Sequence, residues 1–154
     1  AGPWFYSWVA ARGYFREYMR NPVRLELEIG GETHSGVTAL AQNSDPFTYF
    51  SKQPVRVCEN VAIDDGSLGM VLLKRANLLD MGAIVPRLLA QRLKAGRHSQ
   101  VEAFEHFAEA RIRSGSTDES GAVRPFPVQV DGDYIGTYEE ITLETDPGAL
   151  TIVA

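Results

Sequence analysis

The chain has 154 residues, of which 44% are hydrophobic and 23% charged, as expected for a soluble globular protein with one ordinary domain. Its formal net charge of −5 argues against broad nucleic-acid binding, which requires a basic face. No apolar run approaches the ~20 residues that a membrane-spanning helix needs. The single cysteine, Cys58, excludes an internal disulfide and is typical of a buried, inert thiol in a reducing compartment.

The N-terminal residues predict an amphipathic helix over 4–20. Large apolar side chains recur there at three- and four-residue steps, and Asn21-Pro22 ends the pattern because the residue before proline is pushed out of the α region. The apolar stripe favours core packing, with a lipid-facing helix as the alternative. The sequence begins at Ala1 without an initiator Met or a signal peptide, so we expect a piece of a longer protein.

The next segment changes to the alternating pattern of strands. Residues 23–29 alternate apolar and charged side chains, which predicts a strand with one buried and one wet face. Gly30-Gly31 predicts a hairpin turn, and residues 33–43 predict the partner strand. After a turn at 43–46, a further strand is expected over 54–58.

The second half predicts more strands and one more helix. Residues 64–67 form a turn before an apolar strand over 68–74, and residues 78–95 are helical with a kink or late start near Pro86. A single strand is expected over 101–113, with Phe107 out of pattern, and a mobile loop over 114–122. Further strands are predicted at 126–131, 133–136, 138–145 and 149–153.

This order predicts a mainly β (α+β) domain. Strands dominate, connections are short, and two helices are attached. We therefore expect one domain over residues 1–154, an antiparallel two-layer β-sandwich with two attached helices.

Few residues have the spacing of a known catalytic motif. The three histidines, His34, His98 and His106, have no zinc-site spacing with one another or with Cys58. His106 lies on an apolar strand face, which favours a satisfied core histidine. The sequence has no G-x-S-x-G nucleophile elbow, no Walker A run and no dinucleotide glycine fingerprint.

Two acidic turns remain, Asp64-Asp65-Gly66 and Asp131-Gly132-Asp133. Asp-Gly between apolar runs predicts a hairpin, and a hairpin tip can present a carboxylate in the open, as a general base requires. Such turns also expose the carboxylate and carbonyl oxygens that Mg²⁺ prefers. Each turn taken alone is more often only a turn.

The two turns occur in a recognisable order with a closing segment. Residues 60–71 contain Asp65-Gly66-Ser67-Leu68, residues 125–134 contain the Asp131-Gly132-Asp133 turn, and residues 141–150 end in Pro147-Gly148-Ala149-Leu150. This resembles the C-terminal half of the soluble diacylglycerol kinase-like lipid kinases, a family that includes sphingosine and ceramide kinases. Its motifs are a "DG-x-L" turn, a "p-x-q-x-DGE" turn and a "P-x-AL" closing strand. The Gln42-Asn43 strand end before an aromatic loop is also similar, so the resemblance covers at least residues 33–154.

The resemblance implies roles for four residues. Asp133 matches the acid of the DGE turn, which serves as general base, although Asp here replaces Glu and is shorter by one methylene. Asp65, with the main-chain oxygens of Ala62 and Ser67, matches a divalent-cation site that is more structural than catalytic. The family's ATP-binding half carries a "GGDGT" loop, which this sequence lacks, so this chain alone is expected to be inactive.

The implied protein is an ATP- and Mg²⁺-dependent lipid kinase. It would phosphorylate a diacylglycerol- or sphingoid-like alcohol, in the cytoplasm and transiently at the membrane surface, with homo-oligomerisation left open. Basic residues over 87–97, namely Arg87, Arg92, Lys94 and Arg97, fit anionic head groups, although a solvated helix face is the favoured interpretation. A NAD kinase-like enzyme and a non-catalytic lipid-binding or regulatory module of the same fold are the alternatives.

Overall fold

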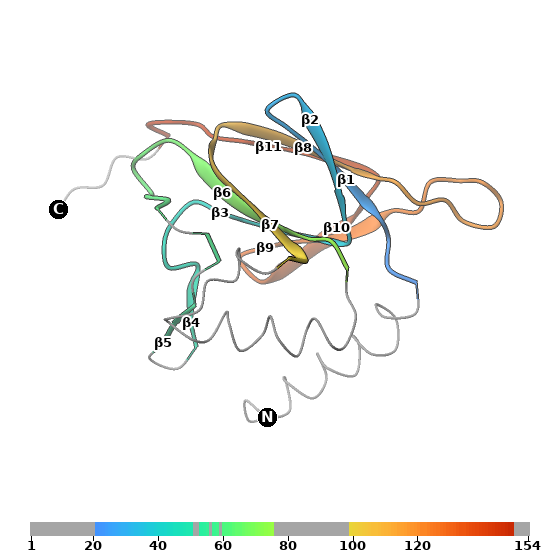
Figure 1. Cartoon of the computed structure of the whole chain (residues 1–154), viewed down its shortest axis with the longest axis horizontal. Helices are drawn as coiled ribbons and strands as arrows, with labels where there is room; N and C mark the ends of the chain where they lie inside the picture. The colour runs from blue at the N-terminus through green and yellow to red at the C-terminus, as the bar shows by residue number, and fades with distance from the viewer. Residues whose placement is uncertain (1–20, 51–52, 56, 59, 76–98, 150–154) are drawn as a thin grey trace.

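The computed structural model describes residues 21–50, 53–55, 57–58, 60–75 and 99–149, in which strands are joined by turns and loops (Figure 1). The first strands are β1 (Leu25–Ile29), β2 (Glu32–Gly36), β3 (Thr38–Gln42), β4 (Thr48–Phe50), β5 (Gln53–Val55) and β6 (Leu68–Leu73). The later strands are β7 (Val101–Phe107), β8 (Glu109–Ser114), β9 (Phe126–Val130), β10 (Asp133–Tyr138) and β11 (Glu140–Glu144). The predicted helices over 4–20 and 78–95 lie outside the described residues.

Two antiparallel sheets pack face to face, which confirms the mainly β sandwich. One sheet has the order β11-β8-β1-β2 and the other has the order β3-β6-β7. Leu27 in β1 and Met70 and Leu72 in β6 are fully buried between them, and Phe126 of β9 joins the same core. The prediction that β1 has one buried and one solvent-exposed face is therefore confirmed, since its leucines point inward and its glutamates outward.

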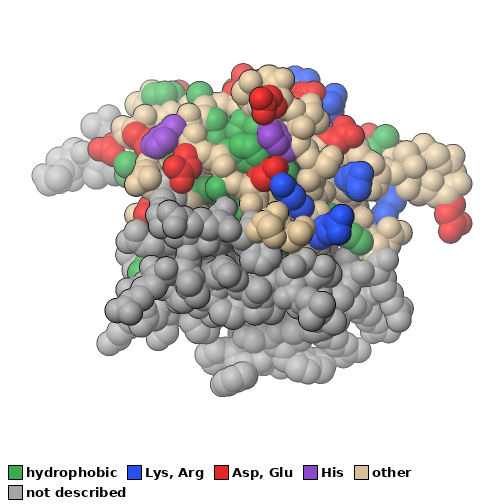
Figure 2. Space-filling view, in the orientation of Figure 1, with side chains coloured by type: hydrophobic (Ala, Val, Ile, Leu, Met, Phe, Trp, Pro, Cys, Tyr) green, Lys and Arg blue, Asp and Glu red, His purple; other side chains and the backbone are tan. Residues whose placement is uncertain are grey.

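The outer face of the four-stranded sheet is an array of paired charges. Glu28 and Glu26 of β1 stand opposite Arg111 and Arg113 of β8. Arg113 Nη2 lies 2.7 Å from Glu28 Oε1 and 3.9 Å from Glu26 Oε2. Charged and apolar side chains are interspersed on the described surface in Figure 2. The wet face is thus held in register by cross-strand pairs of opposite charge.

Two segments that we expected to be single strands each cross from one sheet to the other. The 33–43 strand divides at Val37 into β2 and β3, and the 101–113 strand divides at Ala108 into β7 and β8. Gly36 precedes the first crossing, where an added Cβ would lie 2.6 Å from Leu72 Cγ and 2.7 Å from the Leu73 carbonyl oxygen. Alternation cannot reveal such crossings, because the buried face continues from one sheet into the other.

The predicted Gly-containing hairpins are present. Gly30 and Gly31 have φ of 59° and 82° between β1 and β2, and Asp131 and Gly132 have φ of 51° and 89° between β9 and β10. Two consecutive residues with positive φ are the signature of the type I′ turn, whose twist matches that of the flanking strands. Sequence therefore located both tips correctly.

Three other expectations need correction or stay open. The strand expected over 54–58 is wrong in its bounds, because β5 covers Gln53–Val55 and Cys58 lies in a bend that packs into the core. The strand expected over 149–153 lies, apart from Ala149, outside the described residues. The 114–122 loop projects from the sandwich in Figure 1 and is organised by Asp118, whose Oδ1 accepts hydrogen bonds from Ser120 N, Ser120 Oγ and Ala122 N.

Candidate functional site

Asp133 is presented at the tip of the β9–β10 ribbon. It is the first residue of β10, directly after the two-residue turn, and it stands opposite Val130. Directly opposed residues of an antiparallel pair share a face, and that face continues through Val128 to Phe126, which is buried in the core. Asp133 is exposed, and its neighbour Val130 is 53% exposed. The tip thus offers an open carboxylate beside an unburied apolar side chain.

The carboxylate of Asp65 is held inside its own loop. Its Oδ2 accepts a hydrogen bond from Ala62 N at 2.9 Å, and its Oδ1 accepts bonds from Ser67 N and Ser67 Oγ, both at 2.7 Å. The turn is closed by Asp65 N, which donates to the Ala62 carbonyl at 3.2 Å. The Ala62 amide, then the Ser67 hydroxyl and amide, lower the pKa of Asp65 below its ordinary value. These hydrogen bonds fix the turn before β6.

His106 belongs to this loop and not to the core, so the expectation of a satisfied core histidine is wrong. Its Nδ1 lies 3.3 Å from Ser67 Oγ and 3.8 Å from Asp65 Oδ2, and its side chain is 53% exposed. The cause is a bulge: β7 pairs Phe107 with Leu68 but Phe104 with Met70, so two residues of β7 oppose Gly69 alone. His106 adopts φ of 57° there. The extra residue turns the imidazole outward and returns Phe107 to the buried face.

The sequence pattern placed His106 in the core, although a contrary signal was present. Phe107 breaks the alternation of the 101–113 pattern, and a break by one residue is what a bulge produces. The hydroxyl of Ser67 donates to Asp65 Oδ1, so its proton points away from His106. This arrangement does not activate Ser67 as a nucleophile. In an activated serine, the hydroxyl donates to the imidazole, which then takes its proton.

The loop before Asp65 is fastened to the sandwich by a buried amide. Gln42, 5% exposed at the end of β3, donates from Nε2 to the Cys58 carbonyl at 3.0 Å and accepts from Cys58 N at 3.3 Å. Gly69 leaves the room for this contact, since an added Cβ would lie 2.6 Å from Val61 Cγ2 and 2.9 Å from Cys58 Cβ. Burial raises the pKa of the Cys58 thiol to about 12, helped by Glu105 and Asp45. The inert thiol predicted from the sequence agrees with this environment.

The structure brings together two of the three motifs on which the resemblance rests. A Cβ added at Gly66 would lie 3.4 Å from Pro147 Cγ, so the closing Asp146-Pro147-Gly148 segment packs beside the Asp64-Asp65-Gly66 turn. No hydrogen bond or ion pair among the described residues joins this assembly to Asp133. Asp65 precedes a strand of the three-stranded sheet, whereas Asp133 opens a strand of the separate β9–β10 ribbon.

The donors around Asp65 bear on the expected cation site. Asp65 Oδ1 already accepts two hydrogen bonds and Oδ2 accepts one, which leaves few lone pairs for a cation. The Ala62 carbonyl also accepts a hydrogen bond, from Asp65 N. Within residues 21–149, less their undescribed gaps, no group of three or more His, Cys, Asp or Glu side chains could hold a metal ion. A cation here would rely on one carboxylate oxygen and main-chain carbonyls, so a cation site at Asp65, Ala62 and Ser67 stays a prediction.

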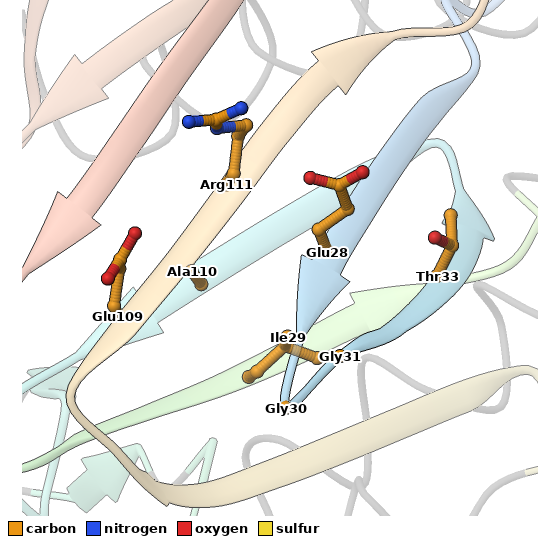
Figure 3. Close-up of a pocket in the computed structure, with 8 residues that line it drawn as sticks. All are labelled: Glu28, Ile29, Gly30, Gly31, Thr33, Glu109, Ala110 and Arg111. Carbon is orange, nitrogen blue, oxygen red and sulfur yellow. The ribbon is translucent and has the colours of Figure 1, made fainter.

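A pocket of about 460 Å³ lies elsewhere, where β1 and β8 separate beyond the Glu28–Arg111 pair (Figure 3). In Figure 3 the side chains of Glu28, Arg111 and Glu109 point to the same side of the sheet. Arg111 Nε also lies 3.7 Å from Glu140 Oε1. The pocket contains neither Asp65 nor Asp133, and its charged lining continues the polar outer face of the sheet.

Solved structures with the same fold are known from Bacillus anthracis str. Sterne. One is described as a diacylglycerol kinase, with a TM-score of 0.53 and 13% identity. Diacylglycerol kinase activity is ascribed to two others, with TM-scores of 0.51 and identities of 16% and 14%. No family model and no curated protein matches the chain.

These matches establish the fold. Each covers 90% of this chain but 48%, 47% or 45% of the other chain, so this chain spans about half the length of those proteins. The matched half is their C-terminal part. The chain therefore has the fold of a diacylglycerol kinase-like C-terminal domain, as the resemblance implied.

Proposed function

We propose that this chain is the C-terminal lobe of a lipid kinase, which transfers the γ-phosphate of ATP to the hydroxyl of a diacylglycerol- or sphingoid-like lipid. One observation carries the proposal: within a domain of this fold, Asp133 stands in the open at the tip of a two-residue hairpin. A rigid turn can hold a carboxylate at a fixed distance from a bound alcohol, which proton transfer requires. Val130 beside it offers an apolar contact for the lipid.

In the proposed reaction Asp133 acts as general base. Its carboxylate accepts the proton of the lipid hydroxyl while that oxygen forms a bond to the γ-phosphorus, and the bond to the bridging oxygen breaks to release ADP. Asp is one methylene shorter than the family's Glu, so the hairpin must approach the substrate more closely. The exposed position of Asp133 at the tip of the ribbon is compatible with such an approach.

ATP would bind chiefly to a domain outside this chain. Mg²⁺ would neutralise charge on the phosphates during transfer, and Asp65, with the carbonyls of Ala62 and Ser67, is the proposed place for a structural cation in this lobe. We propose that the protein acts from the cytoplasm at the membrane periphery. Among the described residues no helix has the length and apolarity to cross a bilayer.

The test is a lipid-kinase assay of the complete gene product with labelled ATP and a panel of lipid alcohols. Asp133→Asn should lower kcat by at least about 100-fold, since general-base catalysis contributes on that order. The matched control is Asp131→Asn, which makes the same change in the same turn, at a position whose φ of 51° asparagine also tolerates. Equal turnover by Asp133→Asn and wild type would remove Asp133 from the base role.

The same assay separates the alternatives. The 154-residue chain alone should bind no ATP and turn over no lipid. Phosphorylation of NAD by the complete protein would favour a NAD kinase-like enzyme. Lipid binding without any transfer would favour a regulatory module of the same fold.

A further inference from the structure

The β9–β10 ribbon contains a bulge three residues from its base. Tyr134 pairs with Gln129, but the next pairing is Gly136 with Val128, so Ile135 has no residue opposite it. A bulge of this kind leaves one residue out of the ladder and increases the local twist. Because the bulge lies between the packed base and the exposed tip, it sets the position of everything beyond it.

Tyr138 holds the bulge by two contacts. Its hydroxyl donates to the Ile135 carbonyl at 3.2 Å, so the residue that has no partner on β9 is hydrogen-bonded within its own strand. Its ring covers Gly136, where an added Cβ would lie 3.4 Å from Tyr138 Cε2 and 3.6 Å from its Oη. Gly136 has φ of 132°, a conformation that residues with a Cβ rarely adopt. Gly136, the Ile135 carbonyl and the Tyr138 side chain therefore stabilise the bulge together.

The bulge decides which residue stands opposite Val130. The pairs at the base are Tyr138–Phe126, Thr137–Pro127 and Gly136–Val128. If this pairing continued to the tip without a bulge, Tyr134 would stand opposite Val130. Asp133 would then lie inside a three-residue loop, a length that hairpins also commonly adopt. A one-residue slip also exchanges the faces of a strand.

We propose that Tyr138 is a positioning residue that holds the ribbon in the register in which Asp133 faces the same side as Val130. Loss of its hydroxyl or ring moves the ribbon toward the slipped register, where a tyrosine replaces the carboxylate on that face. The effect on catalysis rests on the proposed function, whereas the effect on register does not. The two are therefore measured separately.

Register is measured on the labelled 154-residue chain by backbone NMR. Wild type should show cross-strand contacts that pair Asp133 with Val130. Tyr138→Phe should raise the slipped population by about fivefold, which is what the loss of one neutral hydrogen bond gives. Tyr138→Ala and Gly136→Ala, which remove the ring or strain the bulge, should raise it further and give contacts between Tyr134 and Val130. Tyr134→Phe removes the same atom from the other tyrosine of β10 and should leave the register unchanged.

The complete protein then reports on positioning. In the same variants, kcat should fall in proportion to the slipped fraction while KM for the lipid stays near its wild-type value. Native contacts in both Tyr138→Ala and Gly136→Ala would overturn the proposal, and so would a fall in kcat without a change of register. If the complete protein has no kinase activity, the proposed function fails, but the NMR result still decides whether Tyr138 sets the register.

Discussion

Substituting Gly69 with alanine should destabilise the domain by a calculable amount. The added Cβ would lie 2.6 Å from Val61 Cγ2 and 2.9 Å from Cys58 Cβ, whereas carbon atoms in good contact are ~3.5–4.0 Å apart. Both neighbours are buried, at 2% and 1% exposure, so they cannot move into solvent without opening the core. Overpacking of this kind costs about 1–3 kcal/mol. Lower entropy of the unfolded chain returns about 0.4–1 kcal/mol.

The expected net loss in free energy of unfolding is about 1.5 kcal/mol. For a domain of this size, that loss lowers Tm by about 3–6 °C. Urea denaturation at constant m-value measures it directly. Val61→Ala removes the closest atom, so Gly69→Ala should cost about 1 kcal/mol less in that background. Unchanged stability of Gly69→Ala, or additive costs in the double variant, would refute crowding as the reason for glycine here.

Three further predictions concern side chains whose environment the structure fixes. Cys58, buried and with its pKa raised to about 12, should be alkylated at pH 8 only as fast as the domain unfolds, and mass spectrometry showing rapid modification of the native protein would contradict this. Lys74, whose Nζ lies 2.8 Å from Glu102 Oε1, and His34 lower the pKa of Glu102. The ionised carboxylate therefore stabilises the fold at pH values above the pKa that Glu102 has in the unfolded chain. This contribution is lost as the pH falls through the lower pKa of the folded state. Glu102→Gln should thus lower the urea midpoint at pH 7 but not in acid, and an equal difference at both would count against the pairing. Asp65→Ala should speed amide hydrogen exchange at its loop donors by about tenfold, since it removes their charged acceptor, and unchanged exchange would disprove that role.

Local chemistry made the hairpins predictable. Gly30-Gly31 and Asp131-Gly132 need positive φ, and few residue types supply it, so the turn positions follow from the sequence alone. The alternation of residues 23–29 likewise fixes the inner and outer faces of β1. These features depend on neighbours within a few residues.

Contacts between distant segments were not predictable in this way. Arg113 pairs with Glu28 across 85 positions of sequence, and no periodicity indicates that partner. The crossings at Val37 and Ala108 keep the apolar pattern unbroken, so the segments read as single strands. His106 was placed in the core because one extra residue in β7 reversed its face. The candidate base Asp133 was found from its motif, whereas the contact between Gly66 and Pro147 required coordinates.

Because the chain crosses between the sheets at Val37 and Ala108, the strands of one sheet are inserted, in sequence, between the strands of the other. The three-stranded sheet is made entirely from residues between these two points, whereas the four-stranded sheet needs strands from both sides of them. During synthesis β1 and β2 emerge early but wait for β8 and β11 before their sheet is complete. We expect the three-stranded layer to form first, because all of its strands come from one continuous stretch of the chain. Pairing strands from both sides of this stretch requires closing a long loop. The entropy cost of that closure is smaller when the residues between the two sides are already ordered, so the second sheet should form faster.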